Sequence, residues 1–468
     1  MALNALGRHV ALVGFMGAGK TTIAPKLAER LHRPLVTLDD EVERRCRDRI
    51  PHIFERDGEE AFRRVESHVL EDVLERRREV VLDLGGGVVT FEDNHDRLAT
   101  DAFTVHLDVD VESAWKRVRR TERPLAEDES AFRRLYDERA PLYRTVADAS
   151  VTGGDVDGAI LAAAGVHHER ESLDRLGGLV PGDGPVALVG DENVLGLYGE
   201  RARAALGDRL VSTHPLPSGE RAKQLSVVER LWHDLPLDRD GTVVALGGGT
   251  TTDTAGFAAA GYLRGVPWVA VPTTLVGQVD AAIGGKTGVD TANGKNLAGA
   301  FHWPARVVID EALLETLPDR ERRNGETELL KTELLAGQDL DARGAAAYKS
   351  ALCLRDPYDR GPRRWLNLGH TFGHALEAAA DFELPHGEAV ALGLLAALEL
   401  SGRDPGRVRE ALDPKPVRVD RDRAWEALLH DKKRAGGEIN VVLLADDGPT
   451  VETLPADEVR AALNSLIR

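Results

Sequence analysis

Cysteine is almost absent from this chain. Only 2 of its 468 residues are cysteines, Cys46 and Cys353, and they stand far apart. Two distant thiols exclude the disulfide framework on which small secreted proteins depend, and they suit a reducing compartment. We therefore expect a cytoplasmic protein whose two thiols are free and either buried or partly exposed.

Net positive charge and long apolar segments are also lacking. The formal net charge is −18, which argues against nucleic acid or an anionic membrane as a partner; adaptation to salt is an alternative reason for so acidic a composition. The longest apolar run, residues 389–398, contains Gly393 and is too short to cross a bilayer. The first residues lack the cationic and apolar regions of a secretion signal. Small molecules are therefore the expected partners.

Lysine is the third scarcity. Of the 60 basic residues, 11 are lysine and the others are arginine. Where arginine has replaced lysine so widely, each remaining lysine is a candidate for chemistry that a guanidinium cannot perform. The lysines that recur in the motifs below are Lys20, Lys223, Lys286, Lys295, Lys331, Lys349, Lys432 and Lys433.

The length suggests roughly three folding units of ~150 residues. Residues 1–165 alternate short apolar runs with amphipathic stretches, the rhythm of a parallel α/β sheet. Residues 166–185 are polar and rich in Gly and Pro, which predicts a linker. A second strand–helix rhythm covers residues 186–312, and the pattern becomes helical over residues 313–468. We expect two α/β domains followed by a mainly helical domain.

The first domain contains a phosphate-binding loop. The stretch G-F-M-G-A-G-K-T fits G-x-x-x-x-G-K-[ST] and lies between a predicted strand and a predicted helix. Its glycines let backbone N–H groups converge on phosphates, and the helix N-terminus adds positive potential. Lys20 is expected to reach the outer phosphates and Thr21 to hold Mg²⁺. The expected residues for ATP with Mg²⁺ are Gly17, Gly19, Lys20, Thr21 and Thr22.

The motifs after this loop indicate a substrate. In order, L-D-D-E-V-E-R-R, F-R-R-V-E, L-G-G-G, R-P-L and E-R-A-P-L-Y-R resemble shikimate kinase, over about residues 8–165. The resemblance implies a P-loop kinase that phosphorylates shikimate with ATP, with Asp39 beside the reacting hydroxyl and Arg123 in a lid over the phosphates. Arginine forks for a small carboxylate agree with this chemistry. The implied shikimate-binding residues are Asp39, Arg63, Gly85, Gly86, Gly87 and Arg139.

One position departs from that family. The family usually has D-T-D where this chain has Thr37, Leu38 and Asp39, so the carboxylate that helps to hold Mg²⁺ is missing. Asp83, at the end of the strand before the glycine triplet, is one substitute. The alternative is that Thr21, ATP and water hold the ion alone. Thr37 is also the only support for a different hypothesis, that the first domain is a non-catalytic nucleotide-binding module.

Two glycine-rich segments in the second half favour a bound nucleotide and a polar substrate. A strand ends in a glycine triplet at residues 247–249, which allows close approach of a pyrophosphate. Further on, Asp280, Lys286, Lys295 and Asn296 fall in one glycine-interrupted segment. A loop with two of the few lysines is typical of contact with an anionic, polyhydroxylated molecule.

Three histidines lie within seventeen residues, at His370, His374 and His386. His370 and His374 are four apart and face the same side of a helix. A lone histidine is more often structural, but this spacing, with a glycine beside each, favours a metal. Two histidines and a carboxylate that leave coordination positions open are typical of catalytic zinc.

The motifs G-G-G-T-T-T-D-T-A-G-F, Y-L-R-G, Q-V-D-A-A-I-G-G-K-T-G, G-K-N-L-A-G-A-F, N-L-G-H-T-F-G-H-A and H-G-E-A-V resemble 3-dehydroquinate synthase, over about residues 180–468. The resemblance implies NAD- and Zn²⁺- (or Co²⁺-) dependent conversion of 3-deoxy-D-arabino-heptulosonate 7-phosphate to 3-dehydroquinate and phosphate. It implies Glu328, His370 and His386 as metal ligands. The implied catalytic residues are Asp280, Lys286, Lys331 and His374.

The same resemblance implies further contacts. Either Lys432 or Lys433 closes the site, and Arg264 reaches a phosphate, across the interface of a homodimer formed by the synthase half. The implied NAD-binding residues are Asp191, Asn193, Glu220, Lys223, Gly248, Gly249, Asp253, Thr273, Thr274, Lys286, Lys295 and Asn296. The implied residues for the heptulosonate phosphate are Arg264, Lys286, Lys349, Arg363, Asn367 and His374.

Two alternatives remain for the second half. One is a related sugar-phosphate cyclase that makes a different carbocycle, and the other is a metal- and NAD-dependent alcohol dehydrogenase of similar architecture. The lysines at 286, 331 and 349 disfavour a dehydrogenase, which has no phosphate to bind. The segment between Lys331 and Lys349 is shorter than expected for the family, but the spacing from Lys349 to His370 is intact.

Overall fold

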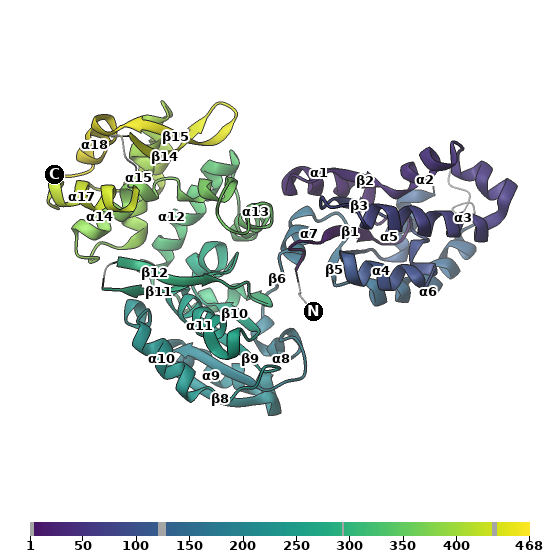
Figure 1. Cartoon of the computed structure of the whole chain (residues 1–468), viewed down its shortest axis with the longest axis horizontal. Coiled ribbons are helices and arrows are strands. Elements are labelled where there is room, and N and C mark those ends of the chain that lie inside the picture. Colours follow the sequence, from purple (N-terminus) through teal and green to yellow (C-terminus); the bar gives the residue numbers. More distant parts are fainter. Residues whose placement is uncertain (1–3, 120–127, 293, 433–437) are drawn as a thin grey trace. The chain divides into compact units, whose positions relative to one another are not determined.

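The computed structural model describes residues 4–119, 128–292, 294–432 and 438–468. The chain forms two compact units, Met1–Val166 and His167–Arg468, coloured along the sequence in Figure 1. Arg123 and Lys433, both named above, lie outside the described residues. In the described part of the chain, no helix is long and apolar enough for a membrane crossing.

The first unit is built on a five-stranded sheet with the order β2-β3-β1-β4-β5, in which every neighbouring pair is parallel. All five residues of β1 are buried, as expected for a parallel strand covered on both faces. The strands are β1 His9–Val13, β2 Leu35–Thr37, β3 Val81–Asp83, β4 Ala102–Asp108 and β5 Ala149–Thr152. The helices are α1 Lys20–Leu31, α2 Leu38–Cys46, α3 Ile50–Leu74, α4 Asp93–Asp101, α5 Val111–Val118, α6 Glu129–Val146 and α7 Val156–Ala163.

Glycine is required in the loop between β1 and α1. Gly17 and Gly19 have φ values of 82° and 95°, which disfavour residues with a Cβ. A Cβ on Gly17 would also lie 2.9 Å from the carbonyl oxygen of Ala114. The loop therefore turns tightly and directs the start of α1 back across the end of β1.

The second unit contains a six-stranded sheet with the order β6-β13-β10-β9-β7-β8. Four of its five pairings, β13 with β10, β10 with β9, β9 with β7 and β7 with β8, are parallel. The strands of this sheet are β6 Val166–His168, β7 Val186–Asp191, β8 Leu210–Leu216, β9 Thr242–Gly247, β10 Trp268–Pro272 and β13 Arg306–Ile309. The helices nearby are α8 Leu176–Leu179, α9 Glu192–Leu206, α10 Leu225–Asp234 and α11 Gly249–Gly261.

Residues 166–185, predicted to be a linker, are instead folded, and all but the first belong to the second unit. The segment begins with edge strand β6, and Leu173, Leu176 and Val180 are buried in the core of the second unit. The side chain of His168 is only 9% exposed and lies 3.3 Å from Glu311. The many polar residues of this segment concealed an apolar spacing of three and four residues, which is the helical spacing of a buried face.

The remainder of the second unit is mainly helical, with two antiparallel hairpins, β11–β12 and β14–β15. It belongs to the same compact unit as the six-stranded sheet. The hairpin strands are β11 Lys286–Thr291, β12 Gly294–Phe301, β14 Glu438–Ala445 and β15 Gly448–Pro455. The helices are α12 Asp319–Ala336, α13 Ala342–Arg355, α14 His370–Ala379, α15 His386–Leu400, α16 Gly406–Leu412, α17 Arg421–Lys432 and α18 Ala456–Ser465.

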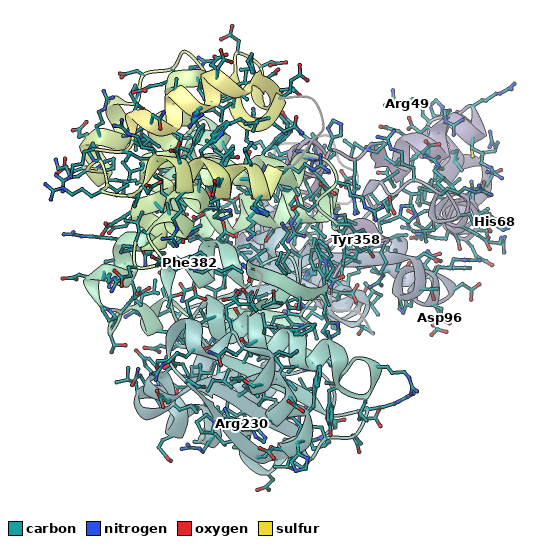
Figure 2. The ribbon with its side chains drawn as sticks, turned by 60° about the vertical axis from the view of Figure 1, so that its left-hand side comes forward. Arg49, His68, Asp96, Arg230, Tyr358 and Phe382 are labelled. Atoms are coloured by element: carbon teal, nitrogen blue, oxygen red, sulfur yellow. The ribbon has the colours of Figure 1, made fainter. Side chains whose placement is uncertain are left out.

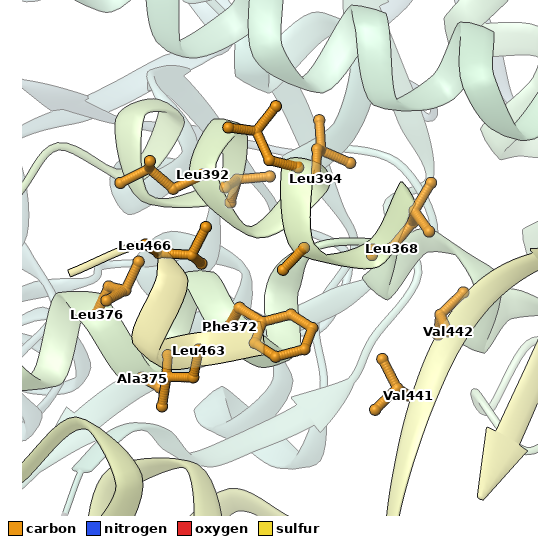
Figure 3. Close-up of a cluster of buried hydrophobic side chains, with 14 of the residues drawn as sticks. Leu368, Phe372, Ala375, Leu376, Leu392, Leu394, Val441, Val442, Leu463 and Leu466 are labelled. Carbon is orange, nitrogen blue, oxygen red and sulfur yellow. The ribbon is translucent and has the colours of Figure 1, made fainter. Parts of the chain in front are cut away.

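The apolar core of this helical part fixes α14 against α15. Phe372 and Leu376 of α14 pack with Leu392 and Leu394 of α15 and with residues of β14 and α18 (Figure 3). The two helices are in close backbone contact, since a Cβ on Gly393 would lie 2.0 Å from the carbonyl oxygen of Gly369. Each helix begins at one of the predicted metal ligands, so this packing sets the distance between the two.

Candidate active sites

The phosphate loop of the first unit has the form predicted from the sequence. The ammonium of Lys20 donates a hydrogen bond of 2.6 Å to the carbonyl oxygen of Gly14. Thr21 and Thr22 follow in the first turn of α1, and both are exposed. The loop therefore presents a cation, two hydroxyls and a helix N-terminus on one side, an arrangement that suits a polyphosphate.

Beside this loop, charged side chains converge on the glycine triplet after β3. A Cβ on Gly87 would lie 2.0 Å from Nη2 of Arg63, so the guanidinium lies directly over that glycine. A Cβ on Gly85 would lie 2.9 Å from Oδ1 of Asp39 and 2.9 Å from Oε1 of Glu66. Arg63, Asp39 and the glycine triplet are thus brought together, as predicted.

Glu66 is a residue of this site that the sequence reasoning missed. It is 1% exposed, and Nη1 of Arg63 donates a hydrogen bond of 2.7 Å to its Oε2. Burial raises the pKa of the Glu66 carboxyl, and the charge of Arg63 only partly opposes this. Its position three residues after Arg63 on α3 was the available signal, since such residues meet on one helix face.

Arg139 and Tyr143 approach the same triplet from α6. Nη1 of Arg139 lies 3.4 Å from the carbonyl oxygen of Gly86, and the hydroxyl of Tyr143 donates to the same oxygen at 2.5 Å. Burial raises the pKa of Tyr143 to about 12. Two guanidiniums, of Arg63 and Arg139, therefore flank one small glycine-lined space, which suits a compact anion.

Thr37 and Asp83 are direct partners across the sheet. Thr37 ends β2, Asp83 ends β3, and their Cα atoms are paired in the parallel register. Asp83 also pairs with Leu12 of β1, two residues before the phosphate loop begins, and is 6% exposed. Paired residues of a parallel sheet point to the same face about 4.8 Å apart, so positions 37 and 83 address the same region.

The second unit contains a cavity of about 750 Å³ at the carboxyl end of its sheet. Ten of the twelve residues predicted to bind NAD line it, and Lys286 and Asn296 do not. Gly248 precedes α11, and a Cβ there would lie 3.0 Å from Thr274. The wall also includes His386, so the cavity reaches the histidine cluster. The predicted residues on its wall are Asp191, Asn193, Glu220, Lys223, Gly248, Gly249, Asp253, Thr273, Thr274 and Lys295.

A largely buried ion pair between Lys223 and Asp253 forms part of the cavity wall. Nζ of Lys223 donates a hydrogen bond of 2.7 Å to Oδ2 of Asp253 and also binds Oδ1 of Asn296. Asn296 therefore contributes through Lys223 and not by facing the cavity. At the rim, the ammonium of Lys295 lies 4.5 Å from the ring centre of Phe382, whose side chain reaches the surface (Figure 2).

Glu328, His370 and His386 form a cluster in which one atom of each lies within 4.8 Å of the others. Nε2 of His370 is 3.5 Å, and Nε2 of His386 is 3.3 Å, from Oε1 of Glu328. Glu328 comes from α12, and the two histidines are the first residues of α14 and α15. One carboxylate and two imidazoles fit a divalent ion of the zinc or cobalt kind.

The electrostatics of this cluster separate its two histidines. Burial lowers the pKa of His370 to about 3, which keeps its imidazole neutral. Burial would also lower the pKa of His386, but its contacts with Glu328 and Glu377 outweigh this and raise it to about 10. Burial opposes ionisation of Glu328, yet Lys331 and the neighbouring histidines hold its pKa well below the usual range. One buried carboxylate and a neutral His370 are thus available as ligand groups for a cation.

Two lysines meet at one carboxylate beside the cluster. Nζ of Lys331 donates to Oδ2 of Asp280 at 2.9 Å and also binds Glu328, while Nζ of Lys349 donates to the carbonyl oxygen of Asp280 at 2.6 Å and binds its Oδ1. Lys331 is 1% exposed. The short connection between α12 and α13, capped by Asp341, leaves both lysines at the site, so the shortened segment does not disrupt it.

A buried guanidinium lies nearby. Arg363 is 1% exposed, and its Nε and Nη2 have no hydrogen-bond partner among the described residues. A Cβ on Gly284 would lie 2.4 Å from Sγ of Cys353 and 2.6 Å from Nη2 of Arg363, so all three meet at one point. Nη1 donates a hydrogen bond of 3.0 Å to the carbonyl oxygen of Pro357. Since buried N–H groups that lack a partner cost free energy, the other two nitrogens suit an anionic ligand. Asn367, half-buried, follows on the same 3₁₀ segment, Pro362–Asn367.

Of the remaining predicted residues, Lys286 and Arg264 are exposed, whereas His374 lies beside the histidine cluster. The side chain of Lys286 is 49% exposed and pairs with Asp359, in the loop that precedes Arg363. Arg264 is exposed and follows Leu263 in a left-handed turn, with φ values of 69° and 49°. His374 lies with its ring centre 5.3 Å from that of His370 and 6.3 Å from that of His386. The backbone of Lys432 ends α17, and its side chain lies outside the described part of the structure.

Comparison with known proteins assigns both units. Family models match for shikimate kinase over residues 16–163, for the N-terminal part of 3-dehydroquinate synthase over residues 213–324, and for its C-terminal part over residues 307–434. The bifunctional shikimate kinase/3-dehydroquinate synthase of Thermotoga maritima is 31% identical over 469 residues, which cover 91% of this chain and 93% of that protein. The chain belongs to this bifunctional family.

Relatives of the synthase half alone are also found. The 3-dehydroquinate synthase of Symbiobacterium thermophilum is 39% identical over 330 residues, 60% of this chain and 90% of that protein. The 2-epi-5-epi-valiolone synthase of Streptomyces hygroscopicus subsp. jinggangensis, solved with NAD⁺ and Zn²⁺, is 28% identical with a TM-score of 0.55, and the match covers 64% of this chain and 96% of that one. Membership of the bifunctional family confirms the resemblance of both halves and removes the dehydrogenase alternative.

Family membership does not assign individual residues, and two contacts of the synthase half escaped the sequence reasoning altogether. Glu377 is 5% exposed and lies 3.3 Å from Nδ1 of His386. Asn324 accepts a hydrogen bond of 3.0 Å from the backbone N–H of Gly387, beside the same histidine. Glu377 is seven residues after His370, a helical spacing that was a usable signal, whereas Asn324 is distant in sequence and gave none.

Proposed function

We propose that the chain carries both activities of its family. The first unit transfers a phosphoryl group from ATP to shikimate, giving shikimate 3-phosphate, and the second converts 3-deoxy-D-arabino-heptulosonate 7-phosphate to 3-dehydroquinate and phosphate. The observation that carries the proposal is the match to the bifunctional relative along 91% of this chain. The phosphate loop with Lys20 and the cluster of Glu328, His370 and His386 support it.

In the kinase unit, Arg139 and Arg63 hold the carboxylate and ring of shikimate over Gly85–Gly87. Asp39 accepts the proton of the hydroxyl that is phosphorylated, and Lys20 stabilises the outer phosphates. Arg123 closes over the reacting groups. Phosphoryl transfer depends on positioning and charge stabilisation more than on covalent participation of the protein, and the convergence of Asp39, Arg63 and Arg139 on one glycine triplet supports these roles.

For the Mg²⁺ that accompanies ATP, we propose Thr21 and Asp83 as the residues that hold it. The register between Asp83 and Thr37 supports this, because a carboxylate at either position serves the same region of the sheet edge. The test is calorimetric binding of ADP with and without Mg²⁺. Asp83→Asn should weaken the Mg²⁺-dependent part at least ~10-fold, and adding Thr37→Asp should restore it. An unchanged Mg²⁺ dependence in Asp83→Asn would show that Thr21, nucleotide and water suffice.

In the synthase unit, the cavity beside Gly248 holds NAD and the Glu–His–His cluster holds Zn²⁺ or Co²⁺. NAD supplies reversible oxidation of one substrate carbon, and the metal supplies Lewis-acid polarisation of the hydroxyl there. Lys331 and Lys349, both anchored on Asp280, bind substrate oxygens. His374, beside the metal ligands, contacts the substrate phosphate and moves protons while that phosphate leaves.

The anionic groups of this substrate bind best to buried cationic side chains whose N–H groups are not already hydrogen-bonded. Arg363 provides one, because its Nε and Nη2 lack hydrogen-bond partners among the described residues. Asn367 follows four residues later on the same 3₁₀ segment, and Lys286 pairs with Asp359, four residues before Arg363. We propose that Arg363 and Asn367 hold the substrate carboxylate.

Arg264 is exposed and absent from the cavity wall. We propose that it binds a phosphate in the site of a partner subunit, which implies a homodimer through the synthase half. Light scattering would give the oligomeric state. Mixing an Arg264 variant with a variant inactivated at another site residue should restore phosphate release if Arg264 acts in the site of the partner subunit.

We further propose a cytoplasmic location, which the free thiols of Cys46 and Cys353 and the use of ATP and NAD support. Fractionation of the source cells with antibody detection would test it.

Two parallel assays on the full chain test the proposed function. One follows phosphate released from the heptulosonate phosphate with NAD⁺ and Zn²⁺, and the other follows ADP formed from shikimate, ATP and Mg²⁺. Lys20→Met should abolish only ADP formation, and Glu328→Gln only phosphate release, so each variant is the control for the other. Phosphate release without ADP formation would make the first unit a regulatory nucleotide-binding module. Release only from another sugar phosphate would assign the second unit to a different cyclase.

A further inference from the structure

One imidazole of the metal cluster is held between two carboxylates. Nε2 of His386 faces Oε1 of Glu328 at 3.3 Å, and Nδ1 on the other side of its ring faces Oε1 of Glu377, also at 3.3 Å. Glu328 is one of the three residues whose ligand atoms lie within 4.8 Å of one another, and Glu377 is not. Glu377 therefore contacts the ring nitrogen of His386 that faces away from Glu328.

Glu377 is enclosed and has a single side-chain partner. It is 5% exposed, and among the described residues only His386 makes a hydrogen bond or ion pair with its carboxylate. A carboxylate this buried is costly unless a donor or a cation compensates it. Its place on α14, two turns after His370, brings it across to the first residue of α15 because the two helices pack backbone to backbone at Gly369 and Gly393.

The other histidine of the cluster is supported differently. Nδ1 of His370 lies 3.2 Å from the carbonyl oxygen of Leu368, a neutral acceptor. A carboxylate on the distal nitrogen raises the basicity of a metal-binding imidazole more than a carbonyl does, and it fixes the tautomer. The two imidazoles of the cluster are therefore not equivalent as ligands.

We propose that Glu377 is a positioning residue that keeps the hydrogen of His386 on Nδ1, directs Nε2 at the metal and makes His386 the stronger of the two imidazole ligands. The inference rests on the proposed metal site of the synthase half. It assigns to Glu377 a function in metal affinity and not in contact with the substrate.

The test measures Zn²⁺ affinity of the metal-free full chain by competition with a chromophoric chelator, and the visible absorption bands of bound Co²⁺. Glu377→Gln keeps the size of the side chain and removes its charge. It should lower Zn²⁺ affinity about 10–100-fold and shift the Co²⁺ bands. The matched control is Glu333→Gln on α12, since the Glu333 side chain is 13% exposed and pairs with Arg407. The Zn²⁺ affinity of this variant should equal that of the unaltered chain.

Each outcome separates this inference from the proposed function. If the unaltered chain fails to bind Zn²⁺, the metal site itself is refuted. If it binds and Glu377→Gln changes affinity less than about threefold with unshifted Co²⁺ bands, the role of Glu377 alone is refuted. Weaker NAD binding with unchanged Zn²⁺ affinity would place Glu377 in the nucleotide site instead, since it also lines that cavity. If Glu377→Gln does not fold, Glu377→Asp, which keeps the charge but shortens its reach, provides the same comparison.

Discussion

Replacing Gly393 with alanine is the sharpest test of how the fold sets the metal site. The added Cβ would lie 2.0 Å from the carbonyl oxygen of Gly369, 2.9 Å from its carbonyl carbon and 3.0 Å from the backbone nitrogen of Gly373. All three neighbours are backbone atoms, so no side chain can rotate away. Ordinary contact at about 3.5 Å requires α14 and α15 to separate by about 1.5 Å at this point.

This separation acts directly on two ligands. The carbonyl oxygen of Gly369 also accepts the first hydrogen bond of α14, from the N–H of Gly373 at 3.0 Å, and His370 follows Gly369 at once. Metal sites tolerate ligand displacements of only about 0.2 Å. We therefore expect Gly393→Ala to lower the stability of the second unit by about 1–3 kcal/mol, the usual cost of overpacking. Zn²⁺ affinity should fall by at least the order of 100-fold.

The assay combines thermal unfolding, chelator competition for Zn²⁺ and both activities. ADP formation by the first unit should be unchanged, which provides an internal control in the same chain. Gly196→Ala is the matched substitution, because Gly196 lies within α9 and a Cβ there meets nothing within 4 Å. It should raise stability by about 0.5–1 kcal/mol. Gly393→Ala with normal Zn²⁺ affinity and phosphate release would refute the view that this backbone contact positions the ligands.

Three other predictions follow from single observations. Arg363→Met should raise KM for the heptulosonate phosphate at least ~100-fold, because two of its nitrogens have no protein partner among the described residues; a normal KM would contradict the anion role. Burial raises the pKa of Tyr143 to about 12 from an unfolded value near 10.0, so the unfolded chain ionises first as pH rises. The stability of the first unit, measured by urea unfolding, should therefore fall by up to about 3 kcal/mol between pH 10 and 12 relative to Tyr143→Phe, and parallel pH curves would contradict this. Treatment with EDTA should abolish both activities; Mg²⁺ alone should restore ADP formation, and phosphate release should require Zn²⁺ or Co²⁺.

Local motifs carried most of what the sequence predicted correctly. The phosphate loop requires its glycines at fixed offsets because φ is positive there, so its form is predictable from the order of its residues alone. The spacing of His370 and His374 likewise predicts a shared helix face. Glu328 was different, because it comes from a separate helix 42 residues before His370, and only the family resemblance selected it among many glutamates.

What the sequence did not reveal depends on contacts between distant segments. Nothing local distinguishes residues 166–185 from a linker until Leu173 and Leu176 meet the core formed by strands far along the chain. The spacing of Glu377 from His370 predicts a shared face of α14, but only the packing of α15 places His386 against Glu377. Burial and pairing are properties of the folded chain, and composition does not contain them.

The synthase site shows why two of the few lysines in this chain are not arginine. Lys331 and Lys349 each bind one oxygen of the Asp280 carboxylate, and Lys331 also binds Glu328 in a space where it is 1% exposed. A compact ammonium can satisfy two carboxylates at once there, whereas a planar guanidinium needs more room and a fixed fork geometry. The two carboxylates are thus neutralised by two ammoniums, and Arg363 adds a positive charge. A chain with a net charge of −18 in this way keeps these three buried cationic side chains in its synthase unit, which suit a phosphorylated, carboxylated substrate better than a neutral sugar.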